Sequence, residues 1–246
     1  MSRYCQMAGW NDAPHLTPEM KATIAAGIPP YQLKARSEGI PMLGAGAIFP
    51  ISEDSITCEP FTIPRTWPRA YGMDVGWNST ACAWGAWDTE GDILYLYNEY
   101  KVGKEPPAIH TTAIKARGNW IPGVIDPHSD DSGQRDGAKL LEEYRDLGLD
   151  LQKANNSVEA GLLEMWRRFT EGRLVVFSSL VAWFGEFRIY HRDENGKIVK
   201  VNDHLMDATR YLVMSGADVA ISEATARAVI YRRAPRHQPG DMRMGY

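Results

Sequence analysis

The sequence predicts an α/β fold in which a mixed β-sheet is covered by helices on both faces. Three stretches rich in apolar and β-branched residues follow one another closely, at 70–77, 81–87 and 93–102. Turn residues at 88–92 separate the second stretch from the third, so we expect three antiparallel strands joined in part by a hairpin. After residue 102, helical and strand-like patterns alternate, which is typical of an α/β sheet.

The second half of the chain supplies the elements that complete this sheet. Its periodicity predicts a helix at 106–116, a strand at 120–125, helices at 136–147 and 158–170, a strand at 173–177, and a helix at 180–190. Gly148 ends one of these helices, as glycine commonly does. A hairpin turn at 193–196 and a last helix at 203–215 complete the body. Three antiparallel strands followed by α/β units are the strand order of an RNase H-like fold.

Residues 1–69 have the character of a segment that leads into this domain. Prolines recur through the segment and interrupt any long element. One short helix is expected at 17–26, with Thr17 as the N-cap and Pro18 in the first helical position. We therefore predict a linker at 1–69 that packs on a domain at 70–218.

Residues 219–246 form a basic C-terminal region. From residue 225 onwards the chain has one acidic residue, Asp241, and five arginines: Arg227, Arg232, Arg233, Arg236 and Arg243. Such a region is either a flexible solvated tail or an arm that binds a partner, and the sequence leaves both interpretations open.

Charge and cysteine content limit the classes of protein. The 246 residues carry a formal net charge of −4, which argues against a domain that holds nucleic acid by bulk electrostatics alone. Cys5, Cys58 and Cys82 fit no metal or disulfide pattern, as expected in a reducing compartment. The sequence has no apolar run of about 18 residues and no signal-peptide pattern, so we expect a cytosolic, non-secreted protein that does not enter a membrane.

Asp74 is the one charged residue in the apolar run at 70–77. An ionised carboxylate buried in a strand costs several kcal/mol unless it is paired, hydrogen-bonded or bound to a cation. We therefore expect the fold to gather partners around Asp74. Two further aspartates lie where a sheet-based site would hold them, because Asp126 closes the strand at 120–125 and Asp207 lies on the last helix.

Asp74, Asp126 and Asp207 together predict a metal site. Clustered carboxylates raise one another's pKa and repel unless divalent cations lie between them. Oxygen ligands without a cluster of Cys or His favour Mg²⁺ or Mn²⁺ over zinc. Two such ions about 4 Å apart can activate a water molecule and stabilise the leaving oxygen of a phosphodiester. The expected chemistry is therefore two-metal hydrolysis of nucleic acid.

The last helix carries two more candidate residues. Asp203, His204 and Asp207 are spaced so that all three can lie along the stripe that faces the sheet. Asp203 is a candidate metal ligand, but it also lies where an N-cap belongs. His204 is either a residue of the site or a polar residue of the first turn. Asp207 could pair with Arg210, although its apolar-rich helix favours a role in the site.

Other polar and aromatic residues are weaker candidates. The loop at 127–135 offers more carboxylates, which we do not expect to be metal ligands. Arg135 and Lys153, together with Asn155 and Asn156, are candidate phosphate contacts, although exposed basic residues are usually ordinary surface residues. The tryptophans with core-like spacing are expected to be core residues and not platforms for base stacking: Trp77, Trp84, Trp87 and Trp166.

Three motifs stand out at this point: Gly72-Met73-Asp74-Val75-Gly76, Val124-Ile125-Asp126-Pro127 and Asp203-His204-Leu205-Met206-Asp207-Ala208-Thr209-Arg210-Tyr211. Together with the proline-rich stretch at 13–46, they resemble the C-terminal nuclease domain of the large terminase subunit of tailed bacteriophages. The resemblance extends over about residues 8–218, and the third motif is its most specific part. It implies that Asp74, Asp126 and Asp207 bind metal, with His204 close by.

The resemblance further implies an endonuclease that cuts concatemeric double-stranded DNA during genome packaging in the host cytoplasm. The implied partners are the packaging ATPase domain of the same protein, the small terminase subunit and the portal. No G-x-x-x-x-G-K-[ST] phosphate loop occurs in the sequence, so we expect a nuclease domain without its motor.

Three other interpretations fit part of the pattern. ATP-binding enzymes of the actin and sugar-kinase class also have Asp-x-Gly on a first strand. They need a second glycine-rich turn that binds phosphate, and this sequence has none. A transposase-type or junction-resolving nuclease would keep the fold and change the task. In the third interpretation the acidic cluster no longer catalyses, and the domain is an assembly module that docks to DNA or portal. A metal titration separates these interpretations.

Overall fold

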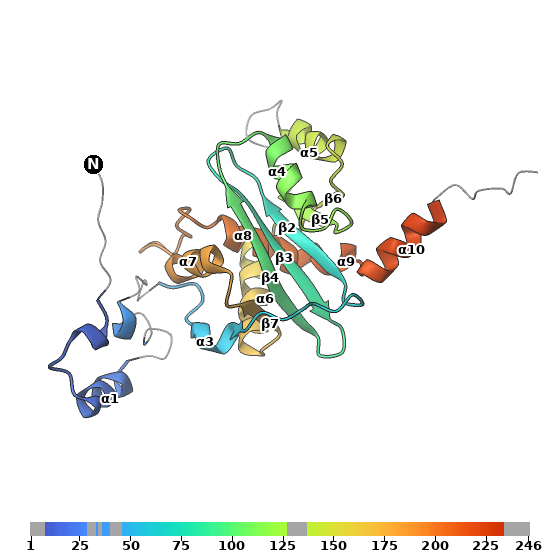
Figure 1. Cartoon of the computed structure of the whole chain (residues 1–246). Coiled ribbons are helices and arrows are strands. Elements are labelled where there is room, and N and C mark those ends of the chain that lie inside the picture. Colours follow the sequence, from blue (N-terminus) through green and yellow to red (C-terminus); the bar gives the residue numbers. More distant parts are fainter. Residues whose placement is uncertain (1–7, 29–32, 34–35, 40–45, 127–136, 234–246) are drawn as a thin grey trace, which may run out of the picture.

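The computed structural model describes residues 8–28, 33, 36–39, 46–126 and 137–233 (Figure 1). Within these residues the body is a seven-stranded mixed sheet in the order β1-β7-β4-β3-β2-β5-β6. The strands are β1 (Thr57–Cys58), β2 (Arg69–Asp74), β3 (Thr80–Asp88), β4 (Ile93–Val102), β5 (Gly123–Ile125), β6 (Leu151–Lys153) and β7 (Leu174–Phe177). β3 is antiparallel to β2 and β4, whereas all other neighbouring strands are parallel. The predicted α/β fold with a mixed sheet is confirmed.

The strands differ from the sequence-based expectation in two respects. β2 ends at Asp74, three residues before the expected end, because the chain turns where Ser79 N donates to Gly76 O at 3.2 Å. The short strands β1 and β6 were not predicted. β1 belongs to the stretch expected to be a linker, and it extends the sheet by pairing with β7.

Helices cover both faces of the sheet, as expected (Figure 1). They are η1 (Trp10–Asp12), α1 (Pro18–Ala26), α3 (Glu53–Ile56), α4 (Pro107–Lys115), α5 (Gly137–Asp146), α6 (Val158–Thr170), α7 (Val181–Ile189), α8 (His204–Tyr211), the π-helical turn η3 (Leu212–Gly216), α9 (Ala217–Val219) and α10 (Glu223–Arg233). The helix predicted at 203–215 corresponds to α8 followed directly by η3, because the chain changes to π-helical geometry after Tyr211.

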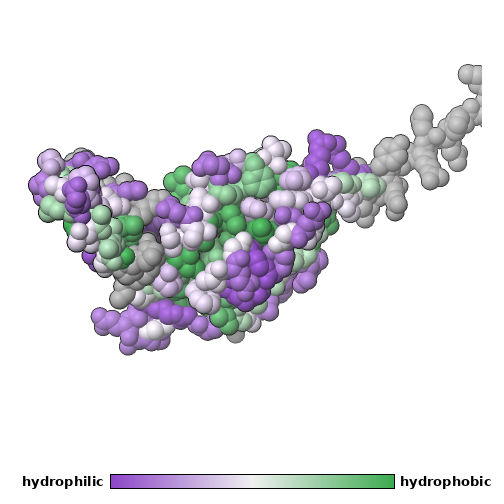
Figure 2. Space-filling model, turned by 90° about the horizontal axis from the view of Figure 1, so that it is seen from below, coloured by the Kyte–Doolittle hydropathy of each residue, from purple (hydrophilic) through white to green (hydrophobic). Residues whose placement is uncertain are grey.

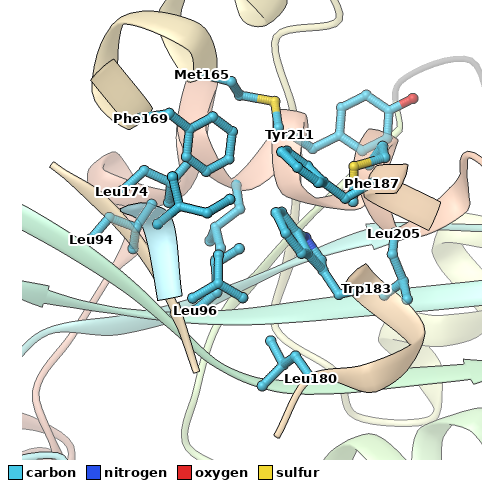
Figure 3. Close-up of a cluster of buried hydrophobic side chains, with 14 of the residues drawn as sticks. Leu94, Leu96, Met165, Phe169, Leu174, Leu180, Trp183, Phe187, Leu205 and Tyr211 are labelled. Carbon is cyan, nitrogen blue, oxygen red and sulfur yellow. The ribbon is translucent and has the colours of Figure 1, made fainter. Parts of the chain in front are cut away.

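One hydrophobic cluster joins the sheet to α6, α7 and α8. This cluster contains Leu94 and Leu96 of β4, Met165 and Phe169 of α6, and Trp183 of α7 (Figure 3). A second cluster joins the other face of the sheet to α4 and α5, and it contains Tyr71, Met73, Trp84, Ile114 and Tyr144. Because successive residues of a strand point to opposite faces, the alternation along β2 places Tyr71 and Met73 in this second cluster.

Gly72 allows helix α8 to lie directly on β2. A Cβ atom at residue 72 would lie 1.9 Å from the carbonyl oxygen of Ala208, so any other residue would push the helix away. Gly72 and Asp74 point to the same face of the sheet, since they are two residues apart on the strand. The close contact therefore brings α8 over the strand that ends in Asp74.

The expectation for the tryptophans is wrong for two of the four. Trp84 is fully buried and Trp87 partly buried against the core. Trp77 is 71% exposed because β2 ends before it, and Trp166 is 44% exposed on the outer side of α6, away from Met165.

The N-terminal segment with α1 and the C-terminal helix α10 extend from opposite sides of the body (Figure 1), and the space-filling view shows the same elongated outline (Figure 2). Thr17 Oγ1 accepts a hydrogen bond of 3.3 Å from Met20 N, which confirms its predicted role as N-cap of α1. α10 occupies part of the region expected to be a flexible tail, whereas residues 234–246 lie outside the described residues. No helix in the described part of the chain is long and apolar enough to cross a membrane.

Candidate active site

Asp74 and Asp126 lie side by side at one edge of the sheet. Asp74 is the last residue of β2, and Asp126 follows the last residue of the parallel strand β5. The register pairs Met73 with Ile125, and Asp126 N donates to Met73 O at 3.3 Å. Parallel pairing of β2 and β5 thus brings together two carboxylates that are far apart in sequence.

Helix α8 adds His204 and Asp207 to this edge. His204, the first residue of the helix, places Nδ1 2.8 Å from Asp74 Oδ2. One turn further on, Ala208 lies against Gly72, so the helix runs along β2 from its end towards its middle. Asp207 is buried between these two contacts.

Two basic residues hold the carboxylate of Asp207. Arg210, whose side chain is 1% exposed, donates to Asp207 Oδ1 from Nη2 at 3.0 Å and from Nε at 3.2 Å. Lys200 Nζ lies 2.7 Å from Asp207 Oδ2 and 3.0 Å from Asp203 Oδ2. Asp207 therefore pairs with Arg210, which the sequence offered as an alternative role. The same residue also lies beside the other carboxylates of the candidate site.

A chain of hydrogen bonds connects Asp207 to Asp126. Arg210 Nη1 donates to Asn156 Oδ1 at 2.9 Å, and Asn156 Nδ2 donates to Asp126 Oδ1 at 3.2 Å. Gly161 makes room for the aliphatic part of the Arg210 side chain, since a Cβ atom at residue 161 would lie 2.5 Å from Arg210 Cγ. Asn156, expected as a phosphate contact, instead orients a carboxylate of the site.

The negative charges at this edge act on one another. Burial raises the pKa of Asp74, the negative charges of Asp207 and Asp126 raise it further, and the hydrogen bond from His204 opposes them. The same hydrogen bond to Asp74 raises the pKa of His204 against the effect of its own burial. The pKa of Tyr211 rises through burial and through the charges of Asp207, Asp74 and Asp126. All three aspartates therefore share one electrostatic environment.

The donor atoms of this environment fit a hard divalent cation, because they are carboxylate oxygens. Within the described residues, however, no three Asp, Glu, His or Cys side chains are arranged to chelate an ion as they stand. Both oxygens of Asp207 face Lys200 or Arg210. A metal would have to replace part of this positive charge.

The remaining candidates have different positions. Asp203 is buried at the N-cap of α8, but its side chain makes no capping hydrogen bond and pairs with Lys200. Lys153 ends β6 with an exposed side chain, two strands away from Asp74 at the same edge. Arg135 and the rest of the loop at 127–135 lie outside the described residues.

Sequence reasoning missed Glu186 and Lys200, and it gave Asn156 a different role. Glu186 Oε2 accepts hydrogen bonds from Leu205 N at 2.6 Å and Met206 N at 3.3 Å, so it caps α8 in place of Asp203. Its signal was available, because Glu186 is a lone carboxylate in the apolar stretch of α7, as Asp74 is in β2. Lys200 gave no such signal, because a single lysine in a loop is usually an ordinary surface residue.

Comparison with known proteins identifies the family. The family described as "Terminase RNaseH-like domain" matches residues 71–215. The large terminase subunit of Enterobacteria phage LP7 is 39% identical over an alignment of 211 residues, and the match covers 81% of this chain and 44% of that protein. The large terminase subunit of Salmonella phage P22 is also 39% identical, over 81% of this chain and 42% of that protein.

A solved structure supports the same relationship. The nuclease domain of the P22 large terminase superposes with a TM-score of 0.70 at 35% identity, covering 75% of this chain and 98% of that domain. The chain spans less than half the length of the two curated relatives. The RNase H-like fold and the resemblance drawn from the three motifs are both confirmed, and the chain belongs to the terminase RNase H-like domain family.

Proposed function

We propose that this chain is the nuclease part of a terminase large subunit and cuts double-stranded DNA as a metal-dependent endonuclease. The observation that carries the proposal is the placement of Asp74, Asp126 and Asp207 at one edge of the sheet, where the other two charges raise the pKa of Asp74. Carboxylates that lie this close together attract a divalent cation, because the positive charge of the ion offsets their mutual repulsion. The likeness to the P22 nuclease domain supports the same activity.

In this proposal Asp74, Asp126 and Asp207 hold Mg²⁺ or Mn²⁺, with two ions at the site and Asp203 as a further candidate ligand. When bound, the metal supplies an activated water and charge stabilisation for the leaving oxygen of the phosphodiester. Lys200 and Arg210 hold Asp207 in place and balance its charge. Asn156 fixes the orientation of Asp126.

His204 orients Asp74 and carries a proton close to the site. Its Nδ1 lies 2.8 Å from Asp74 Oδ2, and this contact raises the pKa of the imidazole, so the ring stays protonated to a higher pH than a free histidine. Lys153 and Arg135 are proposed to contact DNA phosphates, which fits the exposed position of Lys153 at the same edge of the sheet.

The biological role follows from the family. We infer that the substrate is concatemeric phage DNA, cut during packaging in the host cytoplasm. The proposed partners are the ATPase domain of the same protein, the small terminase subunit and the portal. The chain itself has no Walker-type phosphate loop, so the ATPase activity must come from another part of the assembly.

The decisive experiment is cleavage of supercoiled plasmid by the purified chain in Mn²⁺, in Mg²⁺ and in EDTA. We expect nicked and linear DNA only with metal, and loss of both products in Asp74→Asn and Asp207→Asn. Asp218→Asn is a matched control, because Asp218 is exposed on α9 and its substitution removes the same charge. The outcomes separate the candidate functions. Equal cutting by the wild type and Asp74→Asn would contradict the assignment of Asp74 as a metal ligand. DNA binding by the wild type without any cutting would favour the alternative in which the domain is a non-catalytic assembly module. Counting Mn²⁺ sites by anomalous scattering tests the number of ions.

A further inference from the structure

Trp77 is an exposed aromatic residue next to the candidate active site. It lies three residues after Asp74, in the turn between β2 and β3, and 71% of its surface is exposed. At about 3.3 Å per residue, its backbone lies within about 10 Å of Asp74. Nucleotides of one DNA strand rise by about 3.4 Å each. The indole is therefore within reach of the nucleotides next to one held at Asp74.

The turn that carries Trp77 is fixed to the chain after β4. Lys104 N donates to Trp77 O at 2.7 Å. Gly103 lies so close to the turn that a Cβ atom there would be 2.0 Å from Asn78 O. A large side chain held out on a fixed backbone can contact a ligand at a low cost in conformational entropy.

A hollow of about 260 Å³ lies beside Trp77. It is formed by the turn after β2 together with α4 and α5, and its lining is Val75, Gly76, Trp77, Thr80, Glu105, Pro107, His110, Leu140 and Tyr144. Val75 and Gly76 directly follow Asp74 in the chain, so the hollow begins beside the end of β2, on the side of the sheet that α4 and α5 cover. Most of the lining is apolar or aromatic, as in sites that hold a flat aromatic ring.

The charges of the hollow favour a base over a phosphate. Among the described residues that line it, none is Lys or Arg, and the acidic Glu105 would repel a phosphate. His110 is buried and bonded to Tyr100 at 2.8 Å through Nδ1, and burial lowers its pKa, so it supplies no positive charge near pH 7. A carboxylate can accept a hydrogen bond from the exocyclic amine of a base.

We propose that this hollow receives one nucleobase of the DNA strand that lies at Asp74, with Trp77 stacked against the base. The inference rests on the proposed nuclease function. Stacking on an aromatic side chain tolerates every base, because each base has a π-face. It also gives a chain of net charge −4 a means of holding DNA that does not depend on bulk charge. A base must leave the helical stack to enter the hollow, and this costs least at an unpaired position.

The test uses the full chain carrying Asp74→Asn, so that DNA is bound without being cut. The probe is a short duplex with a single unpaired 5-iodouracil, which crosslinks on irradiation to an aromatic ring stacked on it. We expect mass spectrometry to find the crosslink on Trp77. Trp77→Ala should weaken binding of this duplex about fivefold to 150-fold, the scale of one base–aromatic stack, and Trp77→Phe should weaken it less.

Two further variants make the test specific. Trp166→Ala removes a partly exposed tryptophan from α6, on the opposite face of the sheet, and should leave binding unchanged. Leu140→Phe narrows the hollow from the side of α5 and should weaken binding as Trp77→Ala does. A crosslink elsewhere than Trp77, or equal binding by the wild type and Trp77→Ala, would overturn the inference. Failure of the nuclease function would appear separately, as equal plasmid cleavage with and without Asp74→Asn.

Discussion

Glu186 Oε2 accepts a hydrogen bond of 2.6 Å from Leu205 N, and through this contact α7 caps the helix that carries His204 and Asp207. The other carboxylate oxygen, Oε1, lies 2.6 Å from Lys101 Nζ on β4. A buried carboxylate with an ammonium partner and two backbone donors is well satisfied, so its loss affects several contacts at once. The start of α8 is thereby fixed relative to both the sheet and α7.

We expect Glu186→Gln to reduce the free energy of unfolding by about 1–3 kcal/mol, because the charge-assisted bonds to Leu205 and Lys101 weaken. Plasmid cleavage should fall further than stability alone explains, by up to about 100-fold, since a shift of α8 moves Asp207. Urea unfolding and cleavage rates measured on the same protein check both effects. Glu159→Gln is the control, because Glu159 forms an exposed pair with Arg192 and should cost under about 1 kcal/mol. Equal losses in the two variants would contradict the capping role.

Gly72→Ala is expected to be strongly destabilising. The new methyl group would lie 1.9 Å from the carbonyl oxygen of Ala208, which is backbone and cannot rotate away. Overpacking of this kind costs about 1–3 kcal/mol or more, and here it also lifts α8 from Asp74. Gly185→Ala on α7 is the matched control, since no atom lies within 4 Å of the added methyl group. That variant should be neutral or more stable by up to about 1 kcal/mol, because alanine favours a helix over glycine. Thermal unfolding of both variants measures the contrast.

Much of the fold and of the site could be predicted from local sequence signals. Asp74 interrupts an apolar strand, Asp126 ends one, and Asp207 lies in an apolar-rich helix, so each aspartate is conspicuous in its own segment. The structure then brings Asp74 and Asp126 together, because β2 and β5 pair in parallel and their ends meet at one edge of the sheet. Gly72, which decides how closely α8 approaches, was visible only as part of a motif.

What the sequence could not predict depends on contacts between distant segments. β1 is only two residues long and forms by pairing with β7, a strand more than 100 residues further along the chain. No local sequence pattern reveals such a pairing. Lys200 and Asn156 become partners of Asp207 and Asp126 only once α8 and β5 are packed. Trp77 is the last residue of the apolar run at 70–77, and its exposure follows from the end of β2 at Asp74.

The buried His110 is expected to make the folded protein sensitive to acid. Burial lowers the pKa of its imidazole, so below about pH 6.5 the unfolded chain binds a proton that the folded chain does not. Its contribution to stability is therefore complete above about pH 6.5 and is lost as the pH falls through the lower pKa of the folded state. Urea unfolding at pH 7.5 and at pH 5.5 should show a smaller loss for His110→Gln than for the wild type. His15→Gln, at an exposed position, should lose as much as the wild type.

Lys200 occupies the carboxylate of Asp207, which is a ligand in the proposed metal site. Its ammonium lies 2.7 Å from Asp207 Oδ2 and 3.0 Å from Asp203 Oδ2. Burial lowers the pKa of Lys200, but the two carboxylates together raise it above the ordinary value, so the side chain is charged at neutral pH. In the absence of metal this charge offsets the repulsion among the aspartates.

We therefore expect Lys200→Gln to bind Mn²⁺ about two- to fivefold more tightly than the wild type, the scale of a partly exposed ion pair. Without metal the variant should melt at a lower temperature, because Asp207 and Asp203 lose a counter-charge. Saturating Mn²⁺ raises the melting temperature of any protein that binds it only when folded, and the rise should be larger in Lys200→Gln. Lys197→Gln removes the same charge from an exposed position on the same loop and should behave as the wild type. A smaller Mn²⁺ shift in Lys200→Gln than in the wild type would show that Lys200 helps to build the metal site instead of competing with the ion.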